Sequence, residues 1–131
     1  MGDNVLMAET TTQSFTVTGA DTAAAVGSGS LPVLATPRLI AWCEAVTCAA
    51  LGDLQEPLTS VGTRVDIAHL APSAVGDKVE VTATISERTE RTVQFTVAAT
   101  HGGTVVGRGT ISRVIVDGKR FMSKLAARGA R

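Results

Sequence analysis

The spacing of hydrophobic positions changes near residue 52. Residues 37–51 place apolar side chains on almost every face of a 3.6-residue period,. Thr36 suits a helix N-cap, Pro37 the first helical position and Gly52 a helix stop,. The pattern predicts one helix, roughly 22 Å long at 1.5 Å per residue. Because this helix is apolar all round, most of its sides must be covered.

After the helix, apolar and polar side chains alternate with the two-residue period of β-strands,. The pair Gly102-Gly103 is a hairpin signal between two such stretches,. The predicted strands cover residues 61–71, 78–88, 92–101 and 104–117, and a shorter strand covers 13–18. Short connections favour antiparallel neighbours. The predicted fold class is therefore α+β, with a sheet that curls around the helix or a second subunit that covers it.

The remaining segments give weaker signals. Residues 19–30 are small, polar and rich in glycine, and we predict a loop there because no GxxxxGK[ST] motif follows,. We expect no fixed structure in residues 1–11, a single domain over 12–125 and a basic tail over 126–131. The whole segment after Asp117 holds five basic residues and no acidic one, and it is predicted to fray.

Composition narrows the possible partners. The chain has 131 residues, of which 44% are hydrophobic and 18% charged, as expected for one globular domain,. Its formal net charge of zero argues against a nucleic-acid partner,. Without a membrane-spanning run or a signal-peptide pattern, we expect a cytoplasmic protein that does not enter a membrane. Cys43 and Cys48 lack metal-site spacing, so we expect no metal and interpret both as small core residues,.

Four polar side chains interrupt the apolar pattern. Glu44 lies within the apolar helix, where an unpaired carboxylate costs several kcal/mol or changes its protonation, so it needs a partner,. His69 and Arg113 fall on the apolar faces of their strands, and Thr36 precedes the helix. Each of the four also has a structural explanation. Thr36 would cap the helix, and Glu44 would lie at a dimer interface and pair there with an arginine. His69 would be a core histidine, and Arg113 would neutralise Glu44. Together, four such side chains facing one core are better explained by a functional site.

The joint spacing of these residues resembles the hotdog-fold acyl-CoA thioesterases, and within them the fluoroacetyl-CoA thioesterase family. The resemblance rests on Ala35-Thr36 followed by Glu44, on Gly62-Thr63 followed by His69-Leu70-Ala71-Pro72, on Gly76-Asp77-Lys78-Val79, and on Gly107-Arg108-Gly109-Thr110 leading to Arg113. It covers roughly residues 12–125. It implies a hotdog fold, in which a curled antiparallel sheet wraps a long central helix and two subunits pair. We therefore expect a homodimer.

The resemblance also implies a Thr–Glu–His catalytic site formed by Thr36, Glu44 and His69, with Gly62 and Arg113 contacting the acyl group. The expected activity is hydrolysis of an acyl-CoA thioester, with coenzyme A as part of the substrate and no separate cofactor. Glu44 would act as nucleophile or as base for water, His69 would move the proton and Thr36 would orient the carboxylate. A backbone N–H near Gly62 would stabilise the oxyanion.

One departure from the family concerns the acyl group. In the family's fluoroacetate-specific member, aromatic residues just before the catalytic threonine close the pocket, whereas residues 29–34 contain none. We therefore expect a different or broader acyl group. Two alternatives remain open: a hotdog enoyl-CoA hydratase or dehydratase, whose Asp/His motif with an Asn-Pro step is missing, and a non-catalytic acyl-CoA-binding protein. Lys119, Arg120 and Lys124 form either a solvated tail or contacts with the phosphates of CoA.

Overall fold

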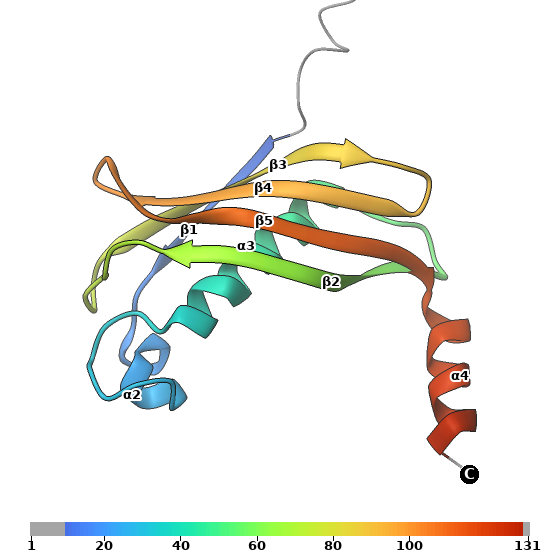
Figure 1. Ribbon diagram of the computed structural model, residues 1–131, viewed down its shortest axis with the longest axis horizontal. Helices are drawn as coiled ribbons and strands as arrows, with labels where there is room; N and C mark the ends of the chain where they lie inside the picture. Colours follow the sequence, from blue (N-terminus) through green and yellow to red (C-terminus); the bar gives the residue numbers. More distant parts are fainter. Residues whose placement is uncertain (1–9, 130–131) are drawn as a thin grey trace, which may run out of the picture.

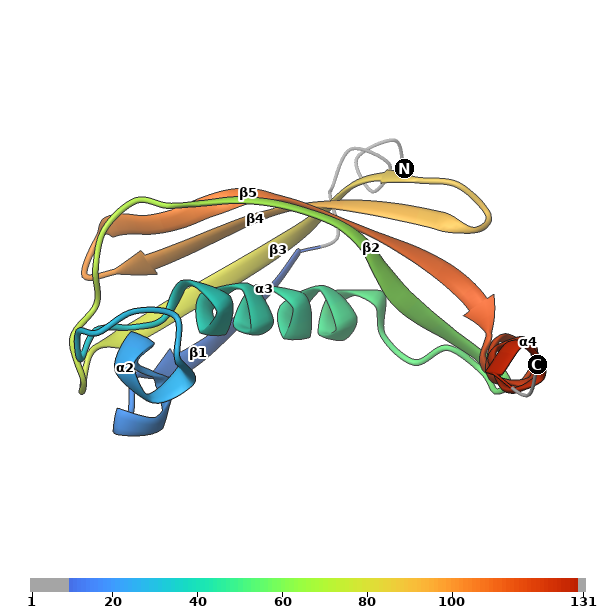
Figure 2. The ribbon, with the colours of Figure 1, turned by 60° about the horizontal axis from the view of Figure 1, so that its bottom comes forward.

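A five-stranded antiparallel sheet covers one long helix in the computed structural model, which describes residues 10–129 (Figure 1). The elements are β1 (Thr10–Thr16), the 3-10 helix η1 (Gly19–Asp21), α2 (Ala23–Val26), α3 (Thr36–Leu51), β2 (Leu58–His69), β3 (Lys78–Arg88), β4 (Thr92–His101), β5 (Thr104–Asp117) and α4 (Gly118–Gly129). The strand order is β1-β3-β4-β5-β2, so β1 and β2 are the edges. The sheet curls around α3 (Figure 2), which confirms the predicted architecture.

The central helix α3 buries one face and leaves another open. Its N-cap is Ala35, so Thr36 is the first helical residue rather than the predicted cap, and Gly52 ends the helix at φ 74°. The buried face consists of Leu39, Trp42, Cys43, Val46, Thr47 and Ala50. The opposite face contains the exposed residues Ala41, Ala45, Cys48 and Ala49. A core position is thus confirmed for Cys43, whereas Cys48 is exposed in the single chain.

The inner face of the sheet supplies the other half of the core. Alternate residues of β3 and β4 point toward α3, and the largest fully buried side chain is Phe95. At the edge, the ring of Phe15 on β1 stacks on Trp42 with ring centroids 4.8 Å apart. A register shift at Ala99/Thr100 changes the alternation locally. As a result, Val106 is buried there, whereas Val105, which an uninterrupted two-residue period would place on the same face as Arg113, is 39% exposed.

Three segments differ from the prediction or extend beyond it. β1 begins at Thr10, inside the segment 1–11 that we predicted to lack fixed structure, while residues 1–9 lie outside the described residues. The predicted loop 19–30 contains η1 and α2. The predicted frayed segment is instead the helix α4, whose first turn is capped by Asp117 Oδ1, which accepts the N–H of Arg120 at 3.0 Å. None of the described helices is long and apolar enough to cross a bilayer.

Candidate functional site

A threonine and a histidine meet where the start of α3 approaches the end of β2. Thr36 Oγ1 lies 2.7 Å from His69 Nδ1, a hydrogen bond whose direction depends on the histidine tautomer. Burial lowers the pKa of His69 below its ordinary value, and a hydrogen bond with the backbone of Ala71 opposes that shift. A lowered pKa keeps the imidazole neutral at neutral pH. His69 can therefore accept a proton there, as a general base must.

The segment between β1 and α3 forms one wall of a cavity beside this pair. The cavity measures about 290 Å³ and is lined by Thr36 and His69 together with apolar residues such as Val33. Asp21 anchors the segment to α3, because its Oδ1 lies 3.2 Å from Arg38 Nε. The backbone carbonyl of Asp21 also accepts the N–H of Ala35 at 2.9 Å. These contacts place the wall next to the first turn of α3.

A second pair, Glu44 and Arg113, lies further along the same helix. Glu44 Oε2 is 3.8 Å from Arg113 Nη1, and the two side chains are 38% and 9% exposed, respectively. Glu44 is therefore only partly buried in the single chain, whereas its place in the apolar helix pattern predicted a buried carboxylate. Its partner is Arg113, the neutralising cation of the structural explanation. Ser60 fixes the guanidinium, since Arg113 Nε donates to Ser60 Oγ at 2.9 Å and Nη2 donates to Ser60 O at 3.3 Å. Sequence reasoning missed Ser60 because the predicted strand began at residue 61.

Gly62 creates the space in which this carboxylate and guanidinium meet. It pairs with Arg113 in the β2–β5 ladder, next to a register shift between Gly62 and Arg64. A Cβ atom at Gly62 would lie 2.8 Å from Glu44 Oε2 and 3.5 Å from Arg113 Nη1. Gly107 has a packing role instead, because a Cβ there would lie 2.8 Å from Leu39 Cδ2. Gly62 therefore lies beside both charged groups, and its contact with the acyl group stays a prediction.

The two pairs do not meet within one chain. Thr36 and Glu44 are roughly 12 Å apart along the axis of α3, and Gly62 and His69 are roughly 20 Å apart along an extended β2. In residues 10–129, Thr36 and His69 contact each other, and Glu44 pairs with Arg113 rather than with either of them. The predicted Thr–Glu–His residues therefore form two separate pairs. Both pairs include contacts with the edge strand β2 or its end.

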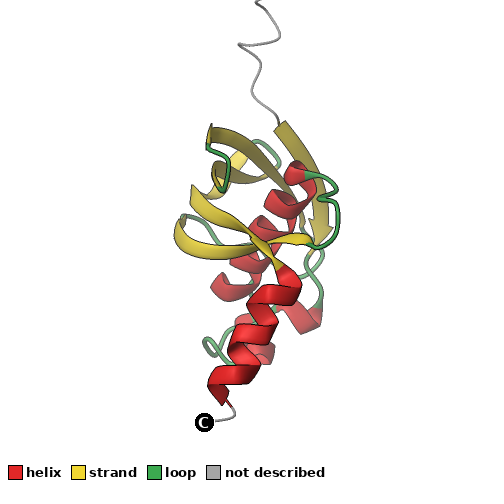
Figure 3. Ribbon diagram, turned by 90° about the vertical axis from the view of Figure 1, so that its right-hand side faces the viewer, coloured by secondary structure: helices red, strands yellow, loops and turns green. Residues whose placement is uncertain are grey.

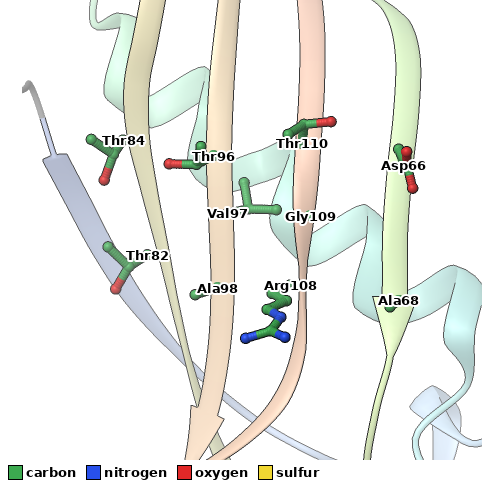
Figure 4. A pocket seen from close by; sticks show the side chains of 10 residues that line it. All are labelled: Asp66, Ala68, Thr82, Thr84, Thr96, Val97, Ala98, Arg108, Gly109 and Thr110. Atoms are coloured by element: carbon green, nitrogen blue, oxygen red, sulfur yellow. The ribbon is translucent and has the colours of Figure 1, made fainter.

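A larger depression of about 520 Å³ lies on the other face of the sheet (Figure 4). Figure 4 shows α3 behind the strands, with threonine side chains, Asp66 and Arg108 lining the near face. The depression contains none of the residues of the two pairs. Among the described residues, no group of three or more His, Cys, Asp and Glu side chains could hold a metal ion.

Comparison with known proteins places the chain among thioesterases. The family model described as "FlK: Fluoroacetyl-CoA-specific thioesterase" matches residues 17–119. A solved structure of the fluoroacetyl-CoA thioesterase FlK is 25% identical, covers 92% of this chain and 95% of that chain, and superposes with a TM-score of 0.86. A thioesterase superfamily member from Thermus thermophilus is 23% identical, with 95% and 93% coverage and a TM-score of 0.86. The search of curated proteins returned no match.

Further structures share the fold. A hot-dog-like protein from Thermanaerovibrio acidaminovorans is 23% identical, with 98% and 97% coverage and a TM-score of 0.84. The range matched by the family model includes both the Thr36–His69 pair and the Glu44–Arg113 pair. The chain has the hotdog fold and belongs to the fluoroacetyl-CoA-specific thioesterase family.

Proposed function

We propose that this chain hydrolyses an acyl-CoA thioester at a site shared by two copies of the chain. The observation that most supports a shared site is that the Thr36–His69 pair and the Glu44–Arg113 pair, which are chemically complementary, lie apart within one chain. A neutral histidine bonded to a threonine lies at one end of α3, and a carboxylate beside an arginine lies two turns away. Family membership supports thioester hydrolysis as the reaction. Joining the two pairs requires a second subunit.

Two open surfaces support a homodimer. β2 is a 12-residue edge strand that pairs with β5 on one side alone within the described sheet. Beside it, the exposed face of α3 carries Ala41, Ala45 and Cys48, which a neighbouring helix could approach closely. Antiparallel pairing of two β2 strands would extend the sheet and cover this face, giving a symmetric interface. A two-fold axis that passes near Ile40, midway between positions 36 and 44, would place Glu44 of one copy opposite Thr36 of the other copy.

The shared site would supply each group that thioester hydrolysis needs. In one route Glu44 attacks the acyl carbon and the C–S bond breaks, which leaves an acyl-glutamyl anhydride that a water molecule then hydrolyses. In the other route Glu44 removes a proton from a water molecule, which attacks the acyl carbon directly and displaces the thiolate. The neutral His69 receives the proton that this water molecule loses and passes it to the departing thiolate, so that the products are a free acid and CoA. Thr36 orients the imidazole through the 2.7 Å hydrogen bond. Arg113 and a backbone N–H near Gly62 stabilise the oxyanion, a type of contact worth about 3 kcal/mol in other enzymes.

A thiol-release screen over short-, medium- and long-chain acyl-CoAs tests the proposed activity. The Glu44→Gln variant keeps the shape of the side chain but loses the carboxylate, so we expect turnover to fall roughly 100-fold or more with the fold retained. The matched control is Glu80→Gln, an exposed glutamate on β3. Wild-type turnover by the Glu44→Gln variant would show that Glu44 is structural.

The same assay separates the alternatives. Acyl-CoA binding without release of thiol at substoichiometric protein would identify a binding protein. Addition of water to an enoyl-CoA without free thiol would identify a hydratase. Either result would refute thioester hydrolysis as the function of the site.

A further inference from the structure

A basic pocket lies at the end of the sheet where β5 runs into α4. Its volume is about 340 Å³, and its walls are Arg91, Val116, Asp117, Arg120, Phe121 and Lys124. Figure 1 shows that the β3–β4 connection and α4 lie at the same end of the molecule, and Figure 3 shows α4 standing out from the sheet. We infer that this pocket binds the phosphorylated nucleotide end of coenzyme A. The inference rests on the proposed acyl-CoA substrate.

Three cations from two separate elements converge on the pocket. Arg91 comes from the β3–β4 connection, while Arg120 and Lys124 are four residues apart and therefore share one face of α4,. The ion pairs of residues 10–129 are Arg38–Asp21, His101–Asp77 and Arg113–Glu44, so none of the three cations has a carboxylate partner within 4.0 Å. Like charges held together without a partner repel each other. A bound polyanion would remove that cost.

The one acidic residue of the pocket offsets only part of this positive charge. Asp117 Oδ1 accepts the N–H of Arg120 at 3.0 Å and so caps the first turn of α4. Three cations remain against this one carboxylate. The pocket therefore favours groups with more than one negative charge, such as the phosphates of CoA.

The aromatic side chain of Phe121 favours a nucleotide over a simple phosphate as the ligand of the pocket. Phe121 lines the pocket and is 39% exposed, and Val116 adds apolar surface beside it. A purine base can stack on an exposed phenyl ring, an interaction that simple phosphates cannot make. Cations and an aromatic ring in one pocket therefore match an adenine nucleotide with several phosphates.

The position of the pocket suits a long substrate. Asp117 lies four residues after Arg113 on β5, which corresponds to roughly 13 Å in an extended strand,. A pantetheine arm can bridge such a separation between a reacting thioester and a nucleotide. Lys119, grouped with Arg120 and Lys124 in the sequence, instead lines a different depression beside Glu56. Arg91, and not Lys119, therefore joins Arg120 and Lys124 in the proposed phosphate-binding group.

Equilibrium binding to the full-length protein tests this inference. The probes are CoA, pantetheine, ADP and inorganic pyrophosphate, measured with wild type and with the double variant Arg91→Gln/Lys124→Gln. Both residues are exposed, so the fold should survive, and the melting temperature checks this. We expect CoA to bind the double variant about tenfold or more weakly, because each lost charge-assisted contact weakens binding, while pantetheine binding stays unchanged. Arg88→Gln is the control, because Arg88 is exposed on the same hairpin but lies outside the pocket.

Each outcome supports or overturns the inference. CoA affinity unchanged in the double variant, or reduced equally by Arg88→Gln, would overturn it. Pyrophosphate that competes with CoA as strongly as ADP does would overturn the nucleotide assignment. In hydrolysis, the KM for acyl-CoA should rise without a change in kcat, and acyl-pantetheine thioesters should be unaffected. Charge-dependent CoA binding without any hydrolysis would refute the proposed function but leave this pocket assignment standing.

Discussion

Replacing Gly62 with alanine tests the geometry of the carboxylate–arginine pair without removing any reacting group. The added Cβ would lie 2.8 Å from Glu44 Oε2 and 3.5 Å from Arg113 Nη1. Real Cβ contacts are longer than the first of these distances, so the Glu44 carboxylate must move. That movement is inexpensive for folding, because the atom displaced is the end of a flexible side chain that is 38% exposed. We expect the stability to change by about 1 kcal/mol or less.

The same displacement should be costly for catalysis. A misplacement of about 1 Å can reduce the rate of a positioned reaction roughly 100-fold. We therefore expect the Gly62→Ala variant to lose about 10- to 100-fold in kcat/KM, measured by thiol release, with a melting temperature close to that of wild type. Gly19→Ala is the matched control, since a Cβ at Gly19 meets no atom within 4 Å. Wild-type turnover by Gly62→Ala would refute the view that Glu44 acts from its observed position.

Two further predictions concern His69 and Ser60. His69→Ala should reduce turnover strongly while acyl-CoA binding is retained, and a variant with lower melting temperature but wild-type turnover per folded molecule would identify a core histidine instead. Because burial lowers the pKa of His69, wild-type activity should rise with pH through a midpoint below about 6.5,. Between the folded and the unfolded pKa of His69, the unfolded chain binds more protons than the folded chain. The contribution of His69 to the free energy of unfolding is therefore complete above the unfolded pKa and is lost as the pH falls through the folded pKa. Ser60→Ala removes the 2.9 Å hydrogen bond to Arg113 Nε, and should cost about 1 kcal/mol of stability and lower kcat,; unchanged kcat would show that Ser60 does not position Arg113.

The elements with strong local signals could be predicted from the sequence. The strands at 78–88, 92–101 and 104–117 have the predicted bounds, because their alternation is regular and their turns carry clear breakers. The Gly102-Gly103 turn adopts positive φ at both residues, as its hairpin sequence indicates,. The sequence did not predict helix α4, because its basic residues indicate a solvated tail, although Phe121, Met122 and Leu125 repeat at helical spacing.

The residues of the two pairs could be singled out from the sequence, but their arrangement could not. Periodicity directs Glu44, His69 and Arg113 toward the core, and the structure brings His69 of β2 to Thr36 of α3 and Arg113 of β5 to Glu44 of α3. Periodicity carries no distance between elements, however. It therefore could not show that Thr36 forms a hydrogen bond with His69 while Glu44 forms an ion pair with Arg113. Nor could it show that Thr36 lies one residue inside the helix, because a cap is assigned from backbone geometry,.

Mixing two inactive variants tests the shared site most directly. A dimer of one Thr36→Ala chain and one Glu44→Gln chain contains two sites. If each site takes Thr36 from one subunit and Glu44 from the other, one site carries both substitutions and the other site carries neither. We therefore predict that unfolding and refolding the two variants together restores thioesterase activity that neither variant has alone. A site contained in one chain would leave every site damaged. Co-refolded heterodimers, verified by tagging the two chains differently, that remain as inactive as the separate variants would contradict the account.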